Sequence, residues 1–232
     1  MFGNRDKKPK LIKVRVKKSS DIYKLPVETI YEEIIKYLKT RRSRYFNFVS
    51  KELREEAILK VFKNTSSEKF KNKLRQAIYL CLARENLFTG KLRITSRLID
   101  LAKEMRVTQV EGILVELARA PELSFISPRE SVILKNQAIE TLIEFDISKE
   151  VLKEIIDNNI FNPNYTEICL IASTKLIPRF DSFLEYFPIA LSLCQDHPEK
   201  IDLSSVLKVG LLVMGDGFIP GDFMPEGFLP DP

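Results

Sequence analysis

Glycine is scarce in most of this 232-residue chain, and that scarcity predicts helices. Of its eight glycines, only Gly90 and Gly112 lie between residues 4 and 209. Because glycine weakens helices and marks turns, the interval is expected to be nearly continuous helix. The apolar spacing agrees, since residues such as Val151, Ile155 and Ile156 share one helical face. We expect helices at 26–41, 44–63, 67–86, 93–106, 109–120, 128–145, 148–158, 163–177, 180–195 and 199–213.

Polar residues that can cap a helix mark several of these starts. Thr65, Thr108 and Ser127 are each followed three residues later by glutamate. This spacing is typical of a capping box, in which the hydroxyl accepts from a backbone amide and the glutamate reaches back. We expect similar starts at Asn162 and Asp196, where proline or an acid follows in the first turn.

The sequence therefore predicts an all-α fold of about ten short helices in antiparallel hairpins. Helix pairs would recur about every 35 to 40 residues, which resembles an irregular HEAT-like solenoid. A compact helical bundle is the alternative, because short connections also produce antiparallel neighbours. We expect three parts: a basic arm over 1–24, a helical domain over 25–213 and a tail over 214–232.

Histidine and cysteine are too few and too scattered to predict a reactive site. His197 is the only histidine, which excludes any site that needs two, and it is expected to be a surface or capping residue. Cys81, Cys169 and Cys194 are far apart and set among apolar residues, so we expect buried free thiols. No glycine-rich phosphate loop is present. We expect no enzymatic activity, no cofactor and no metal.

Long uncharged apolar runs are absent as well. None approaches the roughly 18 to 20 residues that a membrane-spanning helix needs. Apolar residues within the first 25 positions alternate with lysine, unlike the core of a secretory signal. We therefore expect no membrane span and a cytoplasmic location.

Charge is divided unevenly along the chain. Residues 1–106 carry 28 Lys and Arg against 12 Asp and Glu, whereas residues 107–232 carry 9 against 20. Residues 1–106 therefore have a net charge of +16, and residues 107–232 a net charge of −11. A field of one sign attracts ligands of the other, so the first half is expected to face an anionic partner. The alternative is that the two halves neutralise each other.

Two basic segments are the candidates for that anionic contact. The arm 1–20 has a net charge of +7, and its Ile12, Val14 and Val16 alternate with cations as in a strand, although a flexible arm is favoured. The segment 39–48 combines arginines, which bind phosphate, with aromatic rings that stack on unpaired bases. The alternative is that its phenylalanines belong to the core. The candidate binding residues are Lys7, Lys8, Lys10, Lys13, Arg15, Lys17, Lys18, Arg41, Arg42, Arg44 and Tyr45.

Residues 98–120 resemble a helix-turn-helix over about 20 positions. Ala102 would occupy the tight packing position and Val107 would follow the turn. However, Arg106 stands where glycine is usual, and the second helix would present Glu111 and Glu116 to phosphate. An antiparallel helical hairpin is therefore the favoured interpretation.

The last 18 residues differ from everything before them. Residues 215–232 contain four Gly, four Pro and four acids but no Lys or Arg, so they are not expected to be helical. Phe218, Phe223 and Phe228 recur every five residues, each followed two positions later by proline. Because exposed rings favour aggregation, we expect the three to dock on the chain's own helices; a recognition peptide for another protein is the alternative.

Taken together, these features predict a non-enzymatic helical adaptor or scaffold. Its basic first half would dock on an anionic macromolecule, and its helical body would bind protein partners. The alternative is a protein that binds nucleic acid directly through the arm and the Arg41–Phe48 region.

Overall fold

The computed structural model describes residues 27–40, 51–84, 92–120, 127–215 and 223, and it confirms the all-α class. No strand occurs within these ranges, and none of the helices they contain is long and apolar enough to cross a membrane. The chain forms two compact units, Met1–Ala77 and Ile78–Pro232, which are described separately below. The helices are α1 (Val27–Thr40), α2 (Lys51–Asn64), α3 (Glu68–Arg84), α4 (Leu92–Glu104), the short 3-10 helix η3 (Thr108–Val110), α5 (Glu111–Arg119), α6 (Pro128–Phe145), α7 (Lys149–Asn159), α8 (Thr166–Ser173), α9 (Arg179–Asp196) and α10 (Leu203–Met214).

In the first unit, aromatic contacts join α1 to the α2–α3 pair. The Tyr31 ring stacks on Phe70 with 3.7 Å between centroids, and the Tyr31 hydroxyl bonds to that of Thr65. Phe62 of α2 lies beneath two cations of α3, with Lys71 Nζ at 5.7 Å and the Arg75 guanidinium carbon at 5.2 Å from its ring centre. Apolar burial and cation–π attraction therefore both hold this unit together.

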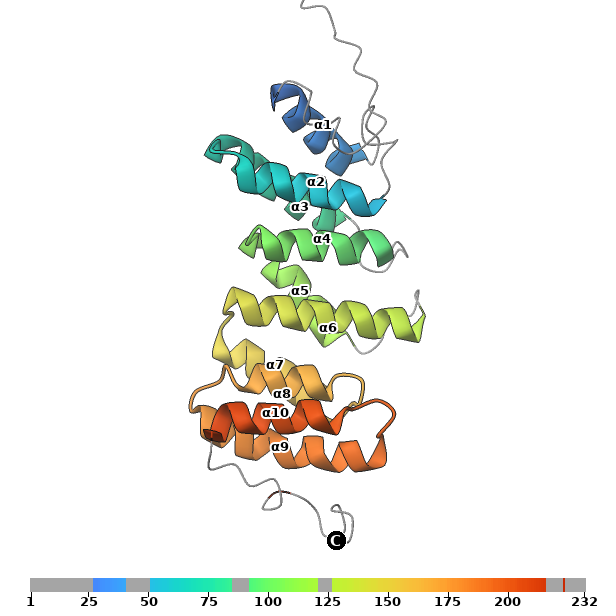
Figure 1. The fold of residues 1–232 in the computed structure, drawn as a ribbon, viewed down its shortest axis with the longest axis vertical. Helices are drawn as coiled ribbons and strands as arrows, with labels where there is room; N and C mark the ends of the chain where they lie inside the picture. Colours follow the sequence, from blue (N-terminus) through green and yellow to red (C-terminus); the bar gives the residue numbers. More distant parts are fainter. Residues whose placement is uncertain (1–26, 41–50, 85–91, 121–126, 216–222, 224–232) are drawn as a thin grey trace, which may run out of the picture. The chain divides into compact units, whose positions relative to one another are not determined.

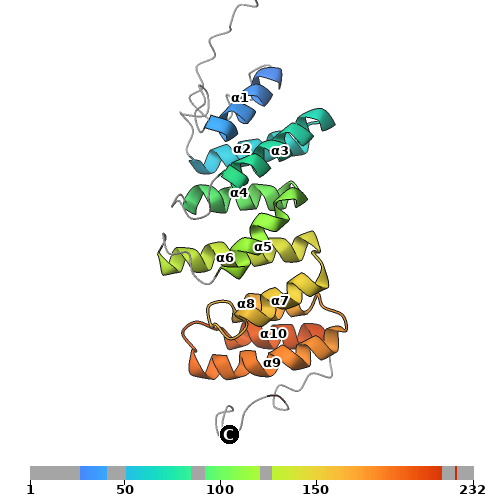
Figure 2. The same ribbon diagram turned by 180° about the vertical axis from the view of Figure 1, so that it is seen from behind.

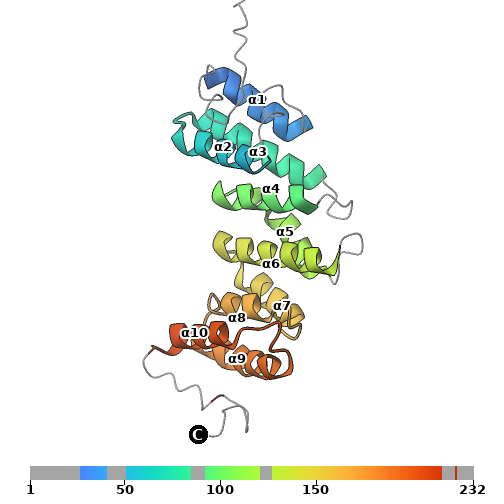
Figure 3. The same cartoon turned by 45° about the vertical axis from the view of Figure 1, so that its right-hand side comes forward.

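In the second unit, each helix packs on helices one or two places away in the chain. Helix α6 contacts α4, α5 and α8, and α8 contacts α7, α9 and α10. Figure 1 shows α9 and α10 side by side in orange and red, and Figure 2 shows α7 beside α8 from behind. The turned view in Figure 3 shows α5 against α6. Their apolar faces form the core, which includes fully buried Ile139, Ile155 and Phe187.

One of the three predicted capping boxes forms as expected. Ser127 Oγ accepts from the Glu130 amide at 3.3 Å, the Glu130 carboxylate accepts from the Ser127 amide, and α6 begins at Pro128. The box predicted from Thr65 is wrong, because Ser67 takes the capping position and its Oγ accepts from the Phe70 amide.

Three other predicted starts are also wrong. Thr108 begins a 3-10 turn, and α5 starts later after Val110 without a side-chain cap. Asn162 Oδ1 accepts from the Asn164 amide within a turn, so α8 begins only at Thr166. Asp196 ends α9, whereas Asp202 caps α10 by accepting from the Ser204 amide at 3.0 Å. The errors at Asn162 and Asp196 share a cause, because Asn and Asp stabilise turns as readily as helix starts.

The turn after α4 has the backbone geometry of a Schellman helix end. The Val107 amide donates to Ala102 O at 2.9 Å and the Arg106 amide to Lys103 O at 3.1 Å. Arg106 has a φ of 50°, the left-handed conformation that glycine adopts most easily. The absence of glycine at this position therefore does not prevent a tight turn.

Candidate functional site

All predicted anion-binding residues, from Lys7 to Lys18 and from Arg41 to Tyr45, lie outside the described residues. The described part of the first unit does contain exposed cations on α3, among them Lys69 and Lys73. Lys71 and Arg75 are held over Phe62 instead, so α3 has both packed and exposed cations.

Of the three tail phenylalanines, Phe223 is described and it contacts α9. Its ring lies edge-on to Phe183 at 6.1 Å and to Phe187 at 5.6 Å between centroids. Both α9 rings are fully buried, and Phe223 itself is half-buried. Phe218 and Phe228 lie outside the described residues, so docking of the full three-ring tail stays a prediction.

Three exposed apolar residues lie near the start of α9 and the end of α10. Ile177 is 83% exposed, Phe180 48% and Leu212 66%. The Arg179 guanidinium donates to Leu212 O at 2.8 Å, which brings the two helix ends together. We call Ile177, Phe180 and Leu212 the apolar patch. Exposed apolar clusters of this kind mark contact surfaces for other proteins.

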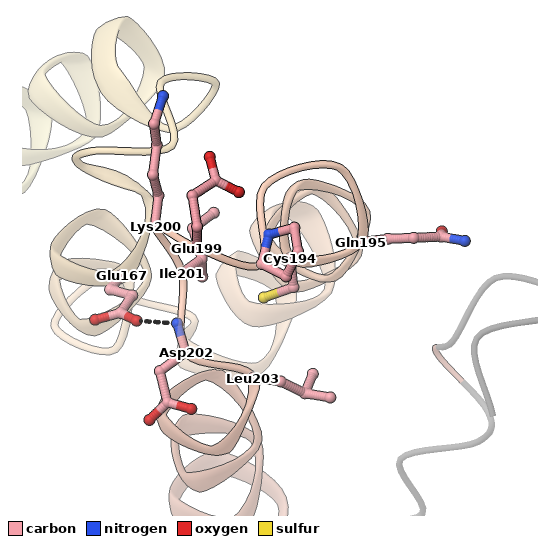
Figure 4. A pocket seen from close by; sticks show the side chains of 9 residues that line it. Glu167, Cys194, Gln195, Glu199, Lys200, Ile201, Asp202 and Leu203 are labelled. Carbon is pink, nitrogen blue, oxygen red and sulfur yellow. Dashed lines mark hydrogen bonds between the residues drawn. The ribbon is translucent and has the colours of Figure 1, made fainter. Parts of the chain in front are cut away.

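A pocket of about 660 Å³ lies at the opposite end of α9, where the chain turns into α10 (Figure 4). Its walls include Cys194, Pro198 and Leu203, together with the charged Glu167 and Lys200. The Glu167 carboxylate accepts from the Asp202 amide at 2.7 Å. The Glu167–Asp202 hydrogen bond thus holds the turn between α9 and α10 in place. Pro198 and Leu203 contribute apolar surface to the pocket.

Two ionisable groups of this pocket, Cys194 and Asp202, have shifted pKa values. Burial raises the pKa of Cys194 to about 11, so its thiol is protonated. Hydrogen bonds from Ser204 and Ser205 lower the pKa of Asp202, which stays ionised. His197 closes α9 as its C-terminal cap, with Nδ1 3.8 Å from Glu199. We expect His197 to be a surface or capping residue, and it caps the end of α9 rather than the start of a helix.

Lys135 of α6 is buried, with 5% of its surface exposed. Its ammonium donates to Ala120 O at 2.7 Å and lies 4.6 Å from the centre of the Tyr165 ring. Burial lowers the pKa of Lys135, and burial also raises the pKa of nearby Cys169 to about 12. The cluster combines a cation, an aromatic face and a protonated thiol within the core.

Lys153 of α7 reaches α9 in a second charged cluster. Its ammonium lies 2.9 Å from Glu185 Oε1 and donates to the Tyr186 hydroxyl at 2.8 Å. That hydroxyl donates in turn to Asp157 at 2.5 Å. Hydrogen bonds to Tyr186 and Glu185 raise the pKa of Lys153, while burial raises that of Tyr186 to about 12.

The sequence interpretation missed the apolar patch, the pocket and both lysine clusters. Lys135 lies on the helical face of Ser131 and Ala138, but only the structure shows that this face is buried. The patch had no sequence signal, since only the fold brings the start of α9 beside the end of α10. The three cysteines are free and buried, as expected.

Comparisons with known proteins add no relative: no family model, no curated protein and no solved structure matches the chain. Among the described residues, no group of three or more His, Cys, Asp or Glu side chains is arranged to hold a metal ion.

Proposed function

We propose that this chain is a helical adaptor whose second unit binds a protein partner through the apolar patch. The observation that carries the proposal is the exposure of Ile177, Phe180 and Leu212 at adjoining helix ends. Removing such side chains from water stabilises a complex by about 25 cal/mol per Å² of buried apolar surface. The partner is expected to present an apolar segment, and the polar rim that includes Arg179 and Asp181 would fix its orientation.

The packing of the second unit supports this role. Helices α4, α6, α8 and α10 contact one another in succession, and α5 contacts α7. Contacts between helices two places apart are typical of stacked hairpins, which present extended surfaces for binding. We propose that this unit is an irregular HEAT-like array; the compact bundle stays the alternative. The expected cytoplasmic location stays a prediction.

The test is a triple variant, Ile177→Ser, Phe180→Ser and Leu212→Ser, compared with wild type in affinity capture followed by mass spectrometry. Partners retained by wild type should be lost from the triple variant. Ile133→Ser is the matched control, because Ile133 is an exposed apolar residue of α6 outside the patch. Equal loss in both variants, or equal retention, would refute the patch as the binding surface.

We also propose that the basic first half docks on an anionic macromolecule, with direct binding of nucleic acid as the alternative function. The charge of +16 over residues 1–106 and the exposed α3 cations support this proposal. Nuclease treatment separates the two functions: protein partners that survive nuclease favour the adaptor, whereas partners lost with nuclease favour nucleic-acid binding. In either case the affinity should fall steeply with salt, because charge neutralisation releases counterions. An affinity that is flat from low to physiological salt would exclude electrostatic docking.

A further inference from the structure

We propose that the region where α2 turns into α3 is a docking surface for the phosphate backbone of a nucleic-acid duplex. Four exposed lysines form this region, and we call them the lysine surface: Lys60, Lys63, Lys69 and Lys73. The placement rests on the proposed docking of the basic first half on a polyanion. It adds the class of partner and the residues that contact it.

The four lysines lie on helix segments that meet at one short turn. The first two lie in the last two turns of α2, and the other two lie in the first two turns of α3. Only residues 65–67 separate the two helices. The segments also pack together, since two cations of α3 lie over the Phe62 ring of α2. Positive charge is therefore concentrated around this turn.

Lys69 and Lys73 are unpaired at positions where their charges weaken the helix. Within the described residues, neither lysine has a carboxylate at ion-pair distance. Glu68, the one acid among residues 60–75, lies 3.0 Å from Lys71 instead. Like charges four residues apart destabilise a helix, and a cation in the first turn opposes the helix dipole. A polyanion bound along this face would offset both penalties.

The lysine surface lacks the apolar centre of a protein interface. Every exposed residue between positions 60 and 75 is polar, and the lysines alternate with side chains such as Asn64 and Asn72. The exposed large apolar residues that the structure describes, from Ile133 to Leu212, all belong to the second unit. Protein interfaces bury an apolar core inside a polar rim. An acidic protein therefore suits the lysine surface less well than a nucleic acid does.

The chemistry of the surface suits the backbone of a duplex rather than unpaired bases. The two rings between positions 60 and 75, Phe62 and Phe70, are buried, so neither is available to stack on a base. Lysine is a compact point charge that binds phosphate without a fixed planar geometry. A DNA duplex carries about one negative charge per 1.7 Å of its axis, which matches a dense group of cations. Binding is thus expected to be independent of base sequence.

Salt-dependent binding of the full chain to a short DNA duplex, followed by fluorescence anisotropy, tests this placement. The variant is Lys69→Gln with Lys73→Gln. Its matched control is Lys175→Gln with Lys208→Gln, which removes the same charge from exposed positions of the second unit. A further variant, Lys69→Arg with Lys73→Arg, keeps the charge. An RNA duplex and polyglutamate are tested as the other two probes.

We expect the slope of log affinity against log salt to become shallower by about 2 in the Gln variant, because each lost phosphate contact removes about 0.9. At physiological salt its affinity for the duplex should fall at least about fivefold. The control and the Arg variant should bind within about twofold of wild type, because distant charges are screened and the Arg variant keeps its charge. If the Gln variant melts below wild type, Lys73→Gln alone should still make the slope shallower by about 1.

The possible failures separate this placement from the proposed docking. Equal weakening of the Gln variant and the control would overturn the lysine surface, as would an unchanged slope in the Gln variant. Tighter binding of polyglutamate than of either duplex would overturn the choice of partner and leave the proposed docking in place. A wild-type chain that binds none of the three probes would refute both.

Discussion

Two lysines of the second unit lie over tyrosine rings, Lys135 over Tyr165 just before α8 and Lys153 over Tyr186 of α9, and their surroundings are opposite. Lys135 is buried, and its ammonium bonds to a backbone carbonyl, that of Ala120. Lys153 has a side chain 46% exposed and lies near two carboxylates, Glu185 and Asp157. The pKa of Lys135 is lowered by burial, whereas that of Lys153 is raised, first by its hydrogen bond to Tyr186.

Lysine therefore stabilises this fold in two ways. Lys135 contributes mainly through its packed methylene stem and through the carbonyl that it satisfies, because its charge is costly to bury. Lys153 contributes through charge, which water and salt weaken. Substitutions that remove the stem or the charge separately should therefore affect the two sites differently.

The largest expected effect is that of Lys135→Ala. It removes the packed stem and the donor to Ala120 O, which is part-buried, so unfolding free energy should fall by about 2–4 kcal/mol. Chemical denaturation measures this change. Lys208→Ala, at an exposed position of α10, is the control and should change stability by less than about 0.5 kcal/mol. A similar small loss in both variants would show that Lys135 is not packed as described.

Tyr186→Phe should have an intermediate effect. It removes the hydroxyl that donates to Asp157 and accepts from Lys153, so unfolding free energy should fall by about 1–2 kcal/mol. Because the folded pKa of about 12 exceeds the ordinary value of 10, this contribution is complete below pH 10 and is lost as pH rises toward 12. Denaturation from pH 9 to 12 should therefore show a shallower alkaline decline in Tyr186→Phe. An identical alkaline decline in wild type and Tyr186→Phe would contradict the raised pKa of Tyr186.

Lys153→Met should have a smaller effect that depends on salt. The ion pairs are exposed, so the loss at low salt should be about 0.5–1 kcal/mol and should shrink as salt is raised. Measurements of Lys153→Met at two salt concentrations check this expectation. A loss that is independent of salt would mean that packing, not charge, is the main contribution of Lys153.

The smallest expected effect at neutral pH is that of Lys135→Met. Methionine keeps the apolar length and removes the buried charge, while the Ala120 carbonyl loses its donor, so the net change should stay within about 1 kcal/mol. The pH dependence distinguishes it from wild type. Because the folded pKa of Lys135 is lowered, its contribution becomes more favourable as pH rises from that lowered pKa to 10.5. The stability difference between wild type and Lys135→Met should shift in favour of wild type over this range; no shift would contradict the lowered pKa.

Much of the helical layout was predictable because it depends on local patterns. Helix α6 occupies the range expected from the Ser127-Pro128-Arg129-Glu130 start and its apolar periodicity. Helix α10 begins four residues later than expected, because Asp202 rather than Asp196 caps it. Sequence shows that both residues can cap a helix, but only the packing of the preceding turn selects one.

The candidate sites were less predictable, since they join residues far apart in the chain. The four-residue spacing of Lys153 and Asp157 is visible in sequence, but their contacts to Glu185 and Tyr186 require α9 to pack beside α7. The contact of Phe223 with α9 likewise depends on the position at which α10 ends. Periodicity places a residue on a face but does not identify the helix opposite.

Because Cys169 is buried, the reactivity of its thiol reports how often the core opens. With a pKa of about 12, about one thiol in 10⁵ is ionised at pH 7 in the folded protein. In an unfolded chain the ordinary thiol pKa gives about one in 10². Because the Cys169 side chain is also fully buried, an alkylating reagent reaches it only when the core opens. The rate at which an alkylating reagent labels Cys169 would report how often the core around α8 opens, without an introduced cysteine.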